Sequence, residues 1–344
     1  MTELTADTPE EAGEITNARK VWLRFRSHKG ALVGMVVLAV IVLGVVLGPF
    51  LHGIEPTRLD YKAKNTQHIF SCFYFSVPDG AQNAEEWTTW NCLSDPVGFT
   101  EATGKRVKVN WKHPLGTDNI GRDMLAQLMA GGQVSLAVGV TAMALAILLG
   151  TLVGVMAGYF RRLDGPMMRL TDLFLSLPIL PLLLVMIMLF RDALRASFGP
   201  ETGIFILVVT AIGITSWMQT ARIVRGDVLA MKRREFVQAA QSYSTPERQI
   251  VVRHVLPNVL SPIMVSATLG IAAAIITESA LSFLGLGFPS DFPTWGRLLT
   301  DGRDFMNITP SRVIWPGLAI SLTVLSVNYI GDGLRDALDP RQRS

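Results

Sequence analysis

The segment from Glu235 to Asn258, EFVQAAQSYSTPERQIVVRHVLPN, is a polar and charged stretch between two strongly apolar runs. Its first half is rich in residues that favour helices, with the small pair Ala239 and Ala240 among polar neighbours. Its second half ends near Pro257, which fixes the backbone where the next apolar run begins. The pattern predicts a short helix, held at both ends, that offers a docking surface to a partner.

The surrounding chain has the composition of a membrane protein. Hydrophobic residues make up 49% of the 344 positions, charged residues only 17%, and the mean hydropathy is +0.36. A helix needs about 20 apolar residues to cross a hydrocarbon core of about 30 Å. We therefore expect an all-α polytopic membrane protein with six transmembrane helices, at Ala31 to Leu51, Val134 to Tyr159, Met168 to Phe190, Ile204 to Thr220, Val259 to Ala280 and Trp315 to Ile330.

Basic residues indicate the orientation of these spans. Lys and Arg gather before the first span, between the second and third, between the fourth and fifth, and after the sixth. By the positive-inside rule, this side is the cytoplasm. We expect cytoplasmic tails at 1–30 and 331–344, a cytoplasmic loop at 221–258, and an external segment at 52–133. The acidic start, MTELTADTPEEAGEIT, lacks apolar periodicity and favours a disordered tail, and the first apolar run is too long for a signal peptide.

The external segment contains both cysteines of the chain, Cys72 and Cys92. In an oxidising compartment, a disulfide closing a loop of about 20 residues stabilises a small region by about 3 kcal/mol. We expect this disulfide, with two unpaired thiols as the alternative. The segment is also rich in Phe, Tyr and Trp, which favours a small packed lobe. Such a lobe contacts an external partner protein or braces a second membrane subunit, or else is only a structural cap.

No motif for catalysis is found. The chain lacks a phosphate-binding loop, a His-Glu-x-x-His pair and a Gly-x-Ser-x-Gly elbow, and its five histidines are scattered. We expect no catalytic residue, cofactor or metal site in this chain, and no nucleic-acid partner.

A stripe of small residues lies along the second span. Ala142, Ala146, Gly150, Gly154 and Gly158 recur every four residues and share one helix face. Such stripes allow two helices to approach closely in lipid. We expect this one to pack against another span, with the fifth, which carries Gly270, Ala272, Ala273 and Ala274, as the candidate. The alternative is that glycine is simply common in membrane helices.

Polar residues in the spans indicate a pathway for a polar solute. The candidate pathway residues are Ser266, Thr277, Glu278, Ser321 and Ser326. Hydroxyl groups let a polar solute pass without trapping it. Glu278 has an alternative role in anchoring the turn that follows it, and Asp172 favours a structural role near head groups or Arg169.

Four blocks of the sequence together resemble one protein family. The opening segment resembles the EAA loop of bacterial ABC transporter permeases, in which Glu-Ala-Ala precedes three residues, Gly, and later a hydrophobic-Leu-Pro ending. Three further blocks look like the oligopeptide, dipeptide and nickel importer permeases. They are HPLGTDNIGRD at His113 to Asp123, ESALSFLGLGFP at Glu278 to Pro289, and GDGLRDALDPR at Gly331 to Arg341. The blocks cover the chain from about His113 to its end.

The resemblance implies a multi-pass subunit of the bacterial inner membrane with a type I ABC importer permease core at 134–330. Its implied partners are the lipid bilayer, a second homologous permease, two ATPase subunits that bind ATP and Mg, and an external substrate-binding protein. Peptides are the expected cargo, and nickel or another small solute is the alternative. The residues that match the ATPase-coupling region of the family are Arg234, Glu235, Phe236, Gln238, Ala239, Ala240, Tyr243, Ser244, Arg253, Leu256 and Pro257.

The chain departs from the family pattern at two positions. Gln238 stands where Glu is usual, which removes a charge but keeps a hydrogen-bonding group of similar shape. Ser244 stands where Gly is usual and adds a Cβ at a turn. Two other functions remain as alternatives. A secondary transporter needs intramembrane ion-coupling residues and usually more spans, and a non-transport scaffold does not need the four blocks.

Overall fold

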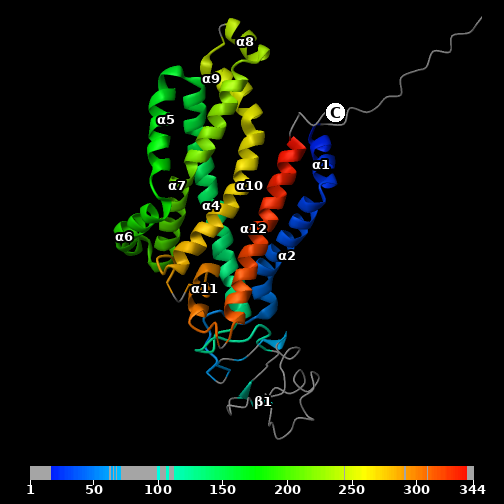
Figure 1. Ribbon diagram of the computed structural model, residues 1–344, viewed down its shortest axis with the longest axis vertical. Helices are drawn as coiled ribbons and strands as arrows, with labels where there is room; N and C mark the ends of the chain where they lie inside the picture. Colours follow the sequence, from blue (N-terminus) through cyan, green and yellow to red (C-terminus); the bar gives the residue numbers. More distant parts are fainter. Residues whose placement is uncertain are drawn as a thin grey trace, which may run out of the picture.

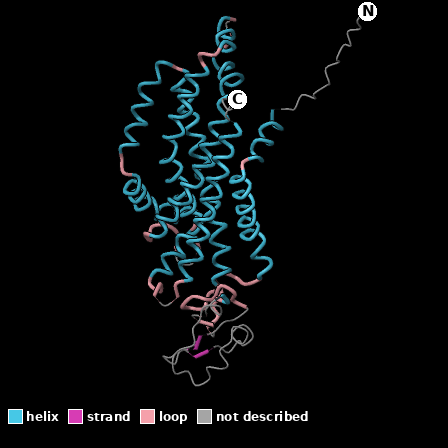
Figure 2. Tube along the Cα trace, turned by 45° about the vertical axis from the view of Figure 1, so that its right-hand side comes forward, coloured by secondary structure: helices cyan, strands magenta, loops and turns pink. Residues whose placement is uncertain are grey.

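The computed structural model describes residues 17–61, 63, 64, 66, 68–70, 99, 100, 106, 107, 112–243, 245–289, 292–307 and 309–338. Most of them lie in long helices that run side by side (Figures 1 and 2). The first half of the bundle contains α1 (Asn17–Ser27), α2 (Lys29–His52), α4 (Met124–Tyr159), α5 (Arg161–Ser176) and α6 (Ile179–Phe198). The second half contains α7 (Pro200–Met231), α8 (Glu235–Ser242), α9 (Glu247–Ile250), the π-helical turn η3 (Val251–Val255), α10 (Leu256–Phe283), α11 (Trp295–Arg303) and α12 (Ser311–Leu338).

Two short strands lie between α2 and α4. Strand β1 (Phe99–Thr100) pairs with β2 (Arg106–Val107) in an antiparallel ladder that aligns Phe99 with Val107. Both cysteines of the expected disulfide, Cys72 and Cys92, lie outside the described residues.

Among the described residues, five helical segments are long and apolar enough to cross a membrane. They are α2, α4, α7, the continuous run Glu247–Phe283, and α12. The expected spans at Ala31 to Leu51, Val134 to Tyr159, Ile204 to Thr220, Val259 to Ala280 and Trp315 to Ile330 lie within them. A sixth span is present only if α5 and α6 together count as one. The all-α polytopic fold class is therefore confirmed.

The expected third span, Met168 to Phe190, is wrong as a single helix. It is divided between α5 and α6, whose axes differ by 89°. The break falls at Leu177 and Pro178, because a residue before proline is driven out of the helical region, and Leu177 is extended at φ −81° and ψ 137°. Helix α6 turns aside at the edge of the bundle instead of continuing the line of α5 (Figure 1).

Several expected boundaries also differ from the structure. Helix α4 begins at Met124, before the expected Val134, because the Asp123 carboxylate caps it by accepting a hydrogen bond of 2.6 Å from the backbone N–H of Ala126. Helix α12 continues to Leu338, so residues 331–338 belong to the helix and not to the expected tail at 331–344.

The expected N-terminal tail at 1–30 contains a helix that the sequence analysis did not predict. Residues Asn17–Ser27 form α1, and Phe25 packs into a small apolar cluster with Ala31 of α2 and Ala337 of α12. Burial against the neighbouring helices stabilises α1, since an 11-residue helix is marginal on its own.

The bundle has two distinct ends. Helices α1 and α8 and the last turns of α12 lie at one end, and the strands and the connections around α11 lie at the other (Figure 1). The two described ends of the chain and the segment after α7 are therefore on the same side of the helix bundle.

The stripe of small residues on α4 is buried, but its partner is α7. Both Ala142 and Ala146 are fully buried. A Cβ built on Gly150 would lie 2.7 Å from the Trp217 carbonyl oxygen, and one on Gly154 would lie 2.6 Å from that of Ala221. Gly158 likewise faces Val228 and the Arg225 carbonyl oxygen. The two backbones thus touch along this face, as small-residue stripes permit.

The fifth span, the expected partner of the stripe, contacts the part of α4 near the start of the stripe. There Gly139 faces Ile275 of α10, and Gly270 of α10 faces Met143. The face that α7 brings to the stripe carries Trp217, Thr220, Ala221, Val224 and Val228. These residues recur at helical spacing, so the groove left by the small residues is filled by a matching row of side chains.

Candidate functional site: an exposed helix and an uncharged cavity

Helix α8 projects from one end of the bundle and has a single fully buried side chain. It follows a tight turn at the end of α7, and Val237 is its only fully buried residue. Val237 belongs to an apolar cluster that includes Val228 of α7, Ile250 of α9 and Val255 of η3. This cluster fixes the position of α8 while most of its surface remains uncovered.

The turn before α8 is held by Lys232. Its ammonium donates a hydrogen bond of 2.7 Å to the Tyr159 carbonyl oxygen at the end of α4 and lies 4.9 Å from the centre of the Tyr159 ring. The ends of α4 and α7 are therefore joined at the point where the chain leaves for α8.

The outward side of α8 carries most of the residues that the resemblance assigned to ATPase coupling. Phe236 is 45% exposed and Tyr243 is 85% exposed. Arg234, Glu235, Gln238 and Ala239 are also exposed, and Ala240 is half-buried. Gln238 donates its amide N–H to the carbonyl oxygen of Arg233 at 3.4 Å. Ser244 lies outside the described residues, so its effect on the turn stays a prediction.

A groove of about 730 Å³ lies along the segment that follows α8, from Pro246 to Pro257. It is lined by Pro246, Arg248, Gln249, Val252, Arg253 and Pro257. Its floor contains η3, whose π-helical hydrogen bonds widen the helix for one turn. Phe236 of α8 lies 6.4 Å from His254 of η3, measured between ring centres. Arg253 and Pro257 line this groove, while Leu256 is half-buried against the apolar cluster.

Two ion pairs connect α5 to α7 near the same end. Arg225 holds both oxygens of Asp164, at 2.5 and 2.8 Å, and Arg222 holds Asp172 at 2.5 Å. Asp172 therefore has a structural role, but its ion-pair partner is Arg222 and not Arg169.

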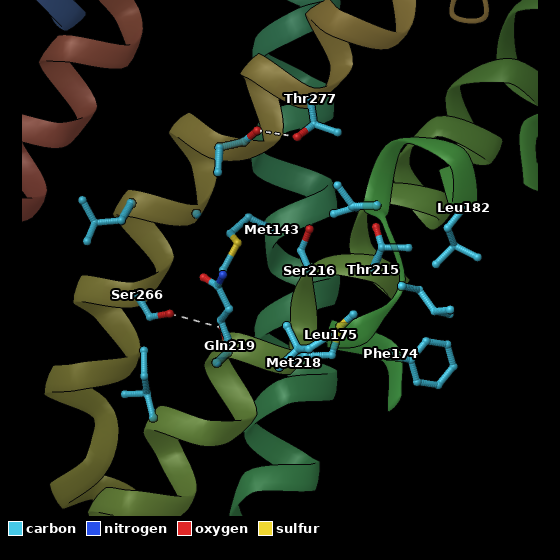
Figure 3. Close-up of a pocket in the computed structure, with 17 residues that line it drawn as sticks. Met143, Phe174, Leu175, Leu182, Thr215, Ser216, Met218, Gln219, Ser266 and Thr277 are labelled. Carbon is cyan, nitrogen blue, oxygen red and sulfur yellow. Dashed lines mark hydrogen bonds between the residues drawn. The ribbon is translucent and has the colours of Figure 1, made fainter. Parts of the chain in front are cut away.

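A cavity of about 470 Å³ lies between the break of α5 and α6 and the helices α7 and α10. Ser266 and Thr277 of α10 line it, together with Thr215, Ser216 and Gln219 of α7. Phe174, Leu175 and Leu182 form the apolar side around the break (Figure 3). None of the 17 lining residues carries an ionisable side chain. The cavity can therefore take a solute with both polar and apolar parts without binding it by charge.

The other three candidate pathway residues lie elsewhere. Ser321 is exposed on α12, and Ser326 is buried on the same helix. Glu278 is fully buried and accepts hydrogen bonds from Ser135 of α4 at 3.0 Å and from Ser282 at 2.8 Å. Ser135 in turn accepts one from the backbone N–H of Trp295. Glu278 thus links α4, α10 and α11 and is not part of the cavity lining.

Sequence reasoning missed the polar residues that α7 contributes to the cavity. Thr215, Ser216 and Gln219 lie in the run TSWMQT, a cluster of hydrogen-bonding side chains inside an apolar span. Polar residues in a span usually face protein or a water-filled cavity, so this run carried the signal.

Comparison with known proteins identifies the family. Residues 124–344 match the family described as the binding-protein-dependent transport system inner membrane component. This chain belongs to that family. Residues 16–67 match a second family, the N-terminal transmembrane domain of oligopeptide transport permease C. The resemblance to importer permeases drawn from the four sequence blocks is confirmed.

Relatives of this inner membrane component span nearly the whole chain. This chain is 33% identical to the oligopeptide transport system permease protein OppC of Haemophilus influenzae, and the match covers 99% of this chain and 94% of that one. It is 35% identical to OppC of Escherichia coli K12 (93% and 90% covered). It is 38% identical to the dipeptide transport system permease protein DppC of Alkalihalophilus pseudofirmus over 68% of this chain and 73% of that one.

A solved structure shares the fold of this family member. A chain of the MetNI methionine ABC transporter, in an inward-facing conformation, superposes with a TM-score of 0.52. The match covers 63% of this chain and 98% of that one, at 18% sequence identity. The helix arrangement expected from the sequence is thus one found in an ABC importer.

Proposed function

We propose that this chain is a permease subunit of an ATP-driven peptide importer and forms half of its translocation pathway. The observation that carries the proposal is the similarity over nearly the full chain to permeases named for oligopeptide transport. The uncharged cavity supports it, because peptides differ in side-chain charge and share a polar backbone. A pathway wall without ionisable groups favours neither sign.

In this proposal, α8 and the adjacent groove receive an ATPase subunit. The exposed Phe236, Ala239 and Tyr243 supply the contact, and Arg253 lies on the rim. The end of the bundle that carries α8 faces the cytoplasm, as the basic residues there indicate, so both ends of the chain are cytoplasmic. ATP and Mg are bound by the ATPase partners. A second permease completes the pathway, and an external binding protein delivers the peptide.

Docking transmits ATP-driven movement because α8 is firmly attached. Val237 fixes α8 to the cluster shared by α4, α7 and α10, so a displacement of α8 moves these helices together. An ATP-bound partner that favours one position of α8 thereby favours one arrangement of the membrane helices.

Reconstitution tests the proposal. The chain is purified with its copurifying subunits and placed in proteoliposomes with the external binding protein, and uptake of labelled peptides and of Ni²⁺ is measured with and without ATP. We expect ATP-dependent uptake of peptides. Uptake of Ni²⁺ alone, or absence of copurifying ATPase and permease subunits, would contradict the proposal.

The Ala239→Arg variant separates docking from folding. Ala239 is exposed, so the substitution leaves the helix bundle intact, but it adds a long charged side chain to the proposed contact. We expect loss of peptide uptake, and either loss of copurifying ATPase or ATP hydrolysis that no longer drives transport. Normal assembly and uptake would contradict docking at α8. Arg303→Gln, an exposed substitution on α11, is the matched control and should transport normally.

The disulfide between Cys72 and Cys92 is part of the same proposal. It closes the external segment and stabilises the surface that meets the binding protein. Alkylation without reductant tests it, because a disulfide leaves neither thiol to react. Full modification of both thiols would contradict it.

A further inference from the structure

Helix α1 presents two different faces. Val21 and Phe25 turn toward the ends of α2 and α12, where Phe25 is buried against Ala31 and Ala337. Trp22 stacks on Phe25, with ring centres 5.9 Å apart, yet it stays 53% exposed, and Leu23 is 50% exposed. Packing within the chain therefore accounts for Val21 and Phe25, while about half of the surface of two further large apolar side chains remains uncovered.

Basic side chains lie beside the exposed apolar pair. Arg26 follows Trp22 by four residues and Leu23 by three, so the three share one helix face. Arg24 is exposed as well. In the part of the chain that the structure describes, neither Arg24 nor Arg26 lies within ion-pair distance of a carboxylate. This face thus combines apolar area with positive charge that the described residues do not neutralise.

The position of α1 is set by the first span. Only His28 separates α1 from α2, and the His28 imidazole accepts the backbone N–H of Ala31 at 3.0 Å, which caps α2. Exposed valines at positions 33, 36 and 40 show the outward apolar face of α2. Because α2 crosses the membrane, α1 must lie where the hydrocarbon meets the head groups.

The composition of the exposed face of α1 suits the boundary between the hydrocarbon and the head groups. Tryptophan is enriched where head groups meet hydrocarbon, and amphipathic helices with basic residues lie in that plane. Anionic lipid attracts basic residues next to a span. We propose that α1 is an interfacial anchor that binds anionic phospholipid, with Arg24 and Arg26 on the phosphates and with Trp22 and Leu23 at the acyl boundary.

Another occupant of this face is the acidic start of the chain. Residues 1–16 contain five carboxylates, at Glu3, Asp7, Glu10, Glu11 and Glu14, which could neutralise the arginines. They offer little apolar surface, however, and so cannot cover Trp22 and Leu23. The exposed apolar pair therefore favours lipid, and the acidic segment becomes an outcome of the test.

Quenching by brominated lipid tests the anchor in the assembled transporter. The complex is placed in nanodiscs that contain brominated phosphatidylglycerol or the same fraction of brominated phosphatidylcholine. The signal of Trp22 is the difference between wild type and Trp22→Phe. We expect at least twofold stronger quenching of this signal by the brominated phosphatidylglycerol. Equal quenching by both lipids, or quenching by neither, would overturn the proposal.

Charge variants identify the residues responsible. The double substitution Arg24→Gln, Arg26→Gln should abolish the preference for the anionic lipid, whereas Arg24→Lys, Arg26→Lys should keep it. The matched control is Arg161→Gln, Arg162→Gln, which removes the same charge from exposed positions at the start of α5 and should leave the preference intact. Loss of the preference in this control would overturn the assignment to α1.

Removal of residues 1–16 distinguishes the two occupants. If lipid covers the face, the truncated chain retains the preference seen in the full chain. A preference that arises only after truncation would show that the acidic segment occupies the face, and the proposal would fail. Peptide uptake by the same variants is measured separately. In the Arg24→Gln, Arg26→Gln variant, loss of the lipid preference with intact uptake supports the anchor and leaves the transport proposal standing, because the two rest on different residues.

Discussion

Small side chains are buried in the contact between α4 and α7, whereas in helix α8 they are exposed. In α4, Gly150 and Gly154 are buried against the backbone of α7, and any added atom would collide with it. In α8, Ala239 is equally small but exposed, and Val237 is the one fully buried residue of the helix. Small residues therefore fix an internal contact in the first region, and in the second they leave part of the helix surface open.

The largest effect is expected from a substitution in the buried contact between α4 and α7. Gly154→Leu places a side chain against the Ala221 carbonyl oxygen and Val224, which must separate α4 from α7. We expect a loss of stability of about 3 kcal/mol or more, and a large loss of protein from the membrane. Thermal unfolding in detergent and membrane abundance measure this. Gly44→Leu is the control, because nothing lies within 4 Å of the position of its Cβ.

A smaller, local effect is expected at the attachment of α8. Val237→Asp puts a charge into an apolar cluster, which is unfavourable enough to detach the short helix. Hydrogen exchange should become fast in residues 235–243 and stay slow in 217–228 of α7. Ala239→Asp, at the exposed position two residues later, should leave both rates unchanged. Equal protection of α8 in the two variants would show that Val237 does not hold it.

The ion pair between α5 and α7 should contribute less. Asp164→Asn weakens the contact with Arg225, which is partly exposed and screened by solvent, so we expect a loss of about 1 kcal/mol or less that shrinks as salt is added. Asp304→Asn, which affects the more exposed pair with Arg303, should have no measurable effect. A loss that is independent of salt would argue for packing instead of charge.

The smallest effect is a pH dependence at the opposite end of the bundle. Burial holds the pKa of the His68 imidazole below its ordinary value of 6.5, and its ring lies 5.7 Å from that of Trp315 in an edge-on contact. The unfolded chain therefore binds a proton more readily, so the stability that His68 provides is complete above pH 6.5 and is lost as the pH falls below it. His68→Phe keeps the ring contact and should remove this part of the pH dependence of thermal unfolding. An unchanged pH profile would contradict the assignment.

Hydropathy predicted the spans because the length of an apolar run is a property of the sequence alone. It did not predict the break at Leu177, where Pro178 lies in a run that is apolar on both sides. The proline was the available signal, and the averaged hydropathy concealed it. Helix α1 was missed for a related reason, because Trp22 and Phe25 lie directly after an acidic, polar stretch.

The candidate site was predicted in part. Periodicity placed the small residues of α4 on one face, but a face does not specify which helix covers it, and α7 was found instead of the fifth span. The position of α8 at one end of the bundle followed from its polar composition. The cavity could not be predicted, because Ser266 and Gln219 come from helices whose contact is decided by packing.

The joined ends of α4 and α7 have a mechanical consequence. Two rods that are bonded along their length resist bending far more than two that slide past each other. The close packing of the α4 glycines against α7 prevents the two helices from sliding. The hydrogen bond from Lys232 to the Tyr159 carbonyl oxygen joins their ends. If an ATPase subunit docks at α8 as proposed, the force on α8 reaches two helices that tilt as one stiff unit, and little of the displacement is lost to bending.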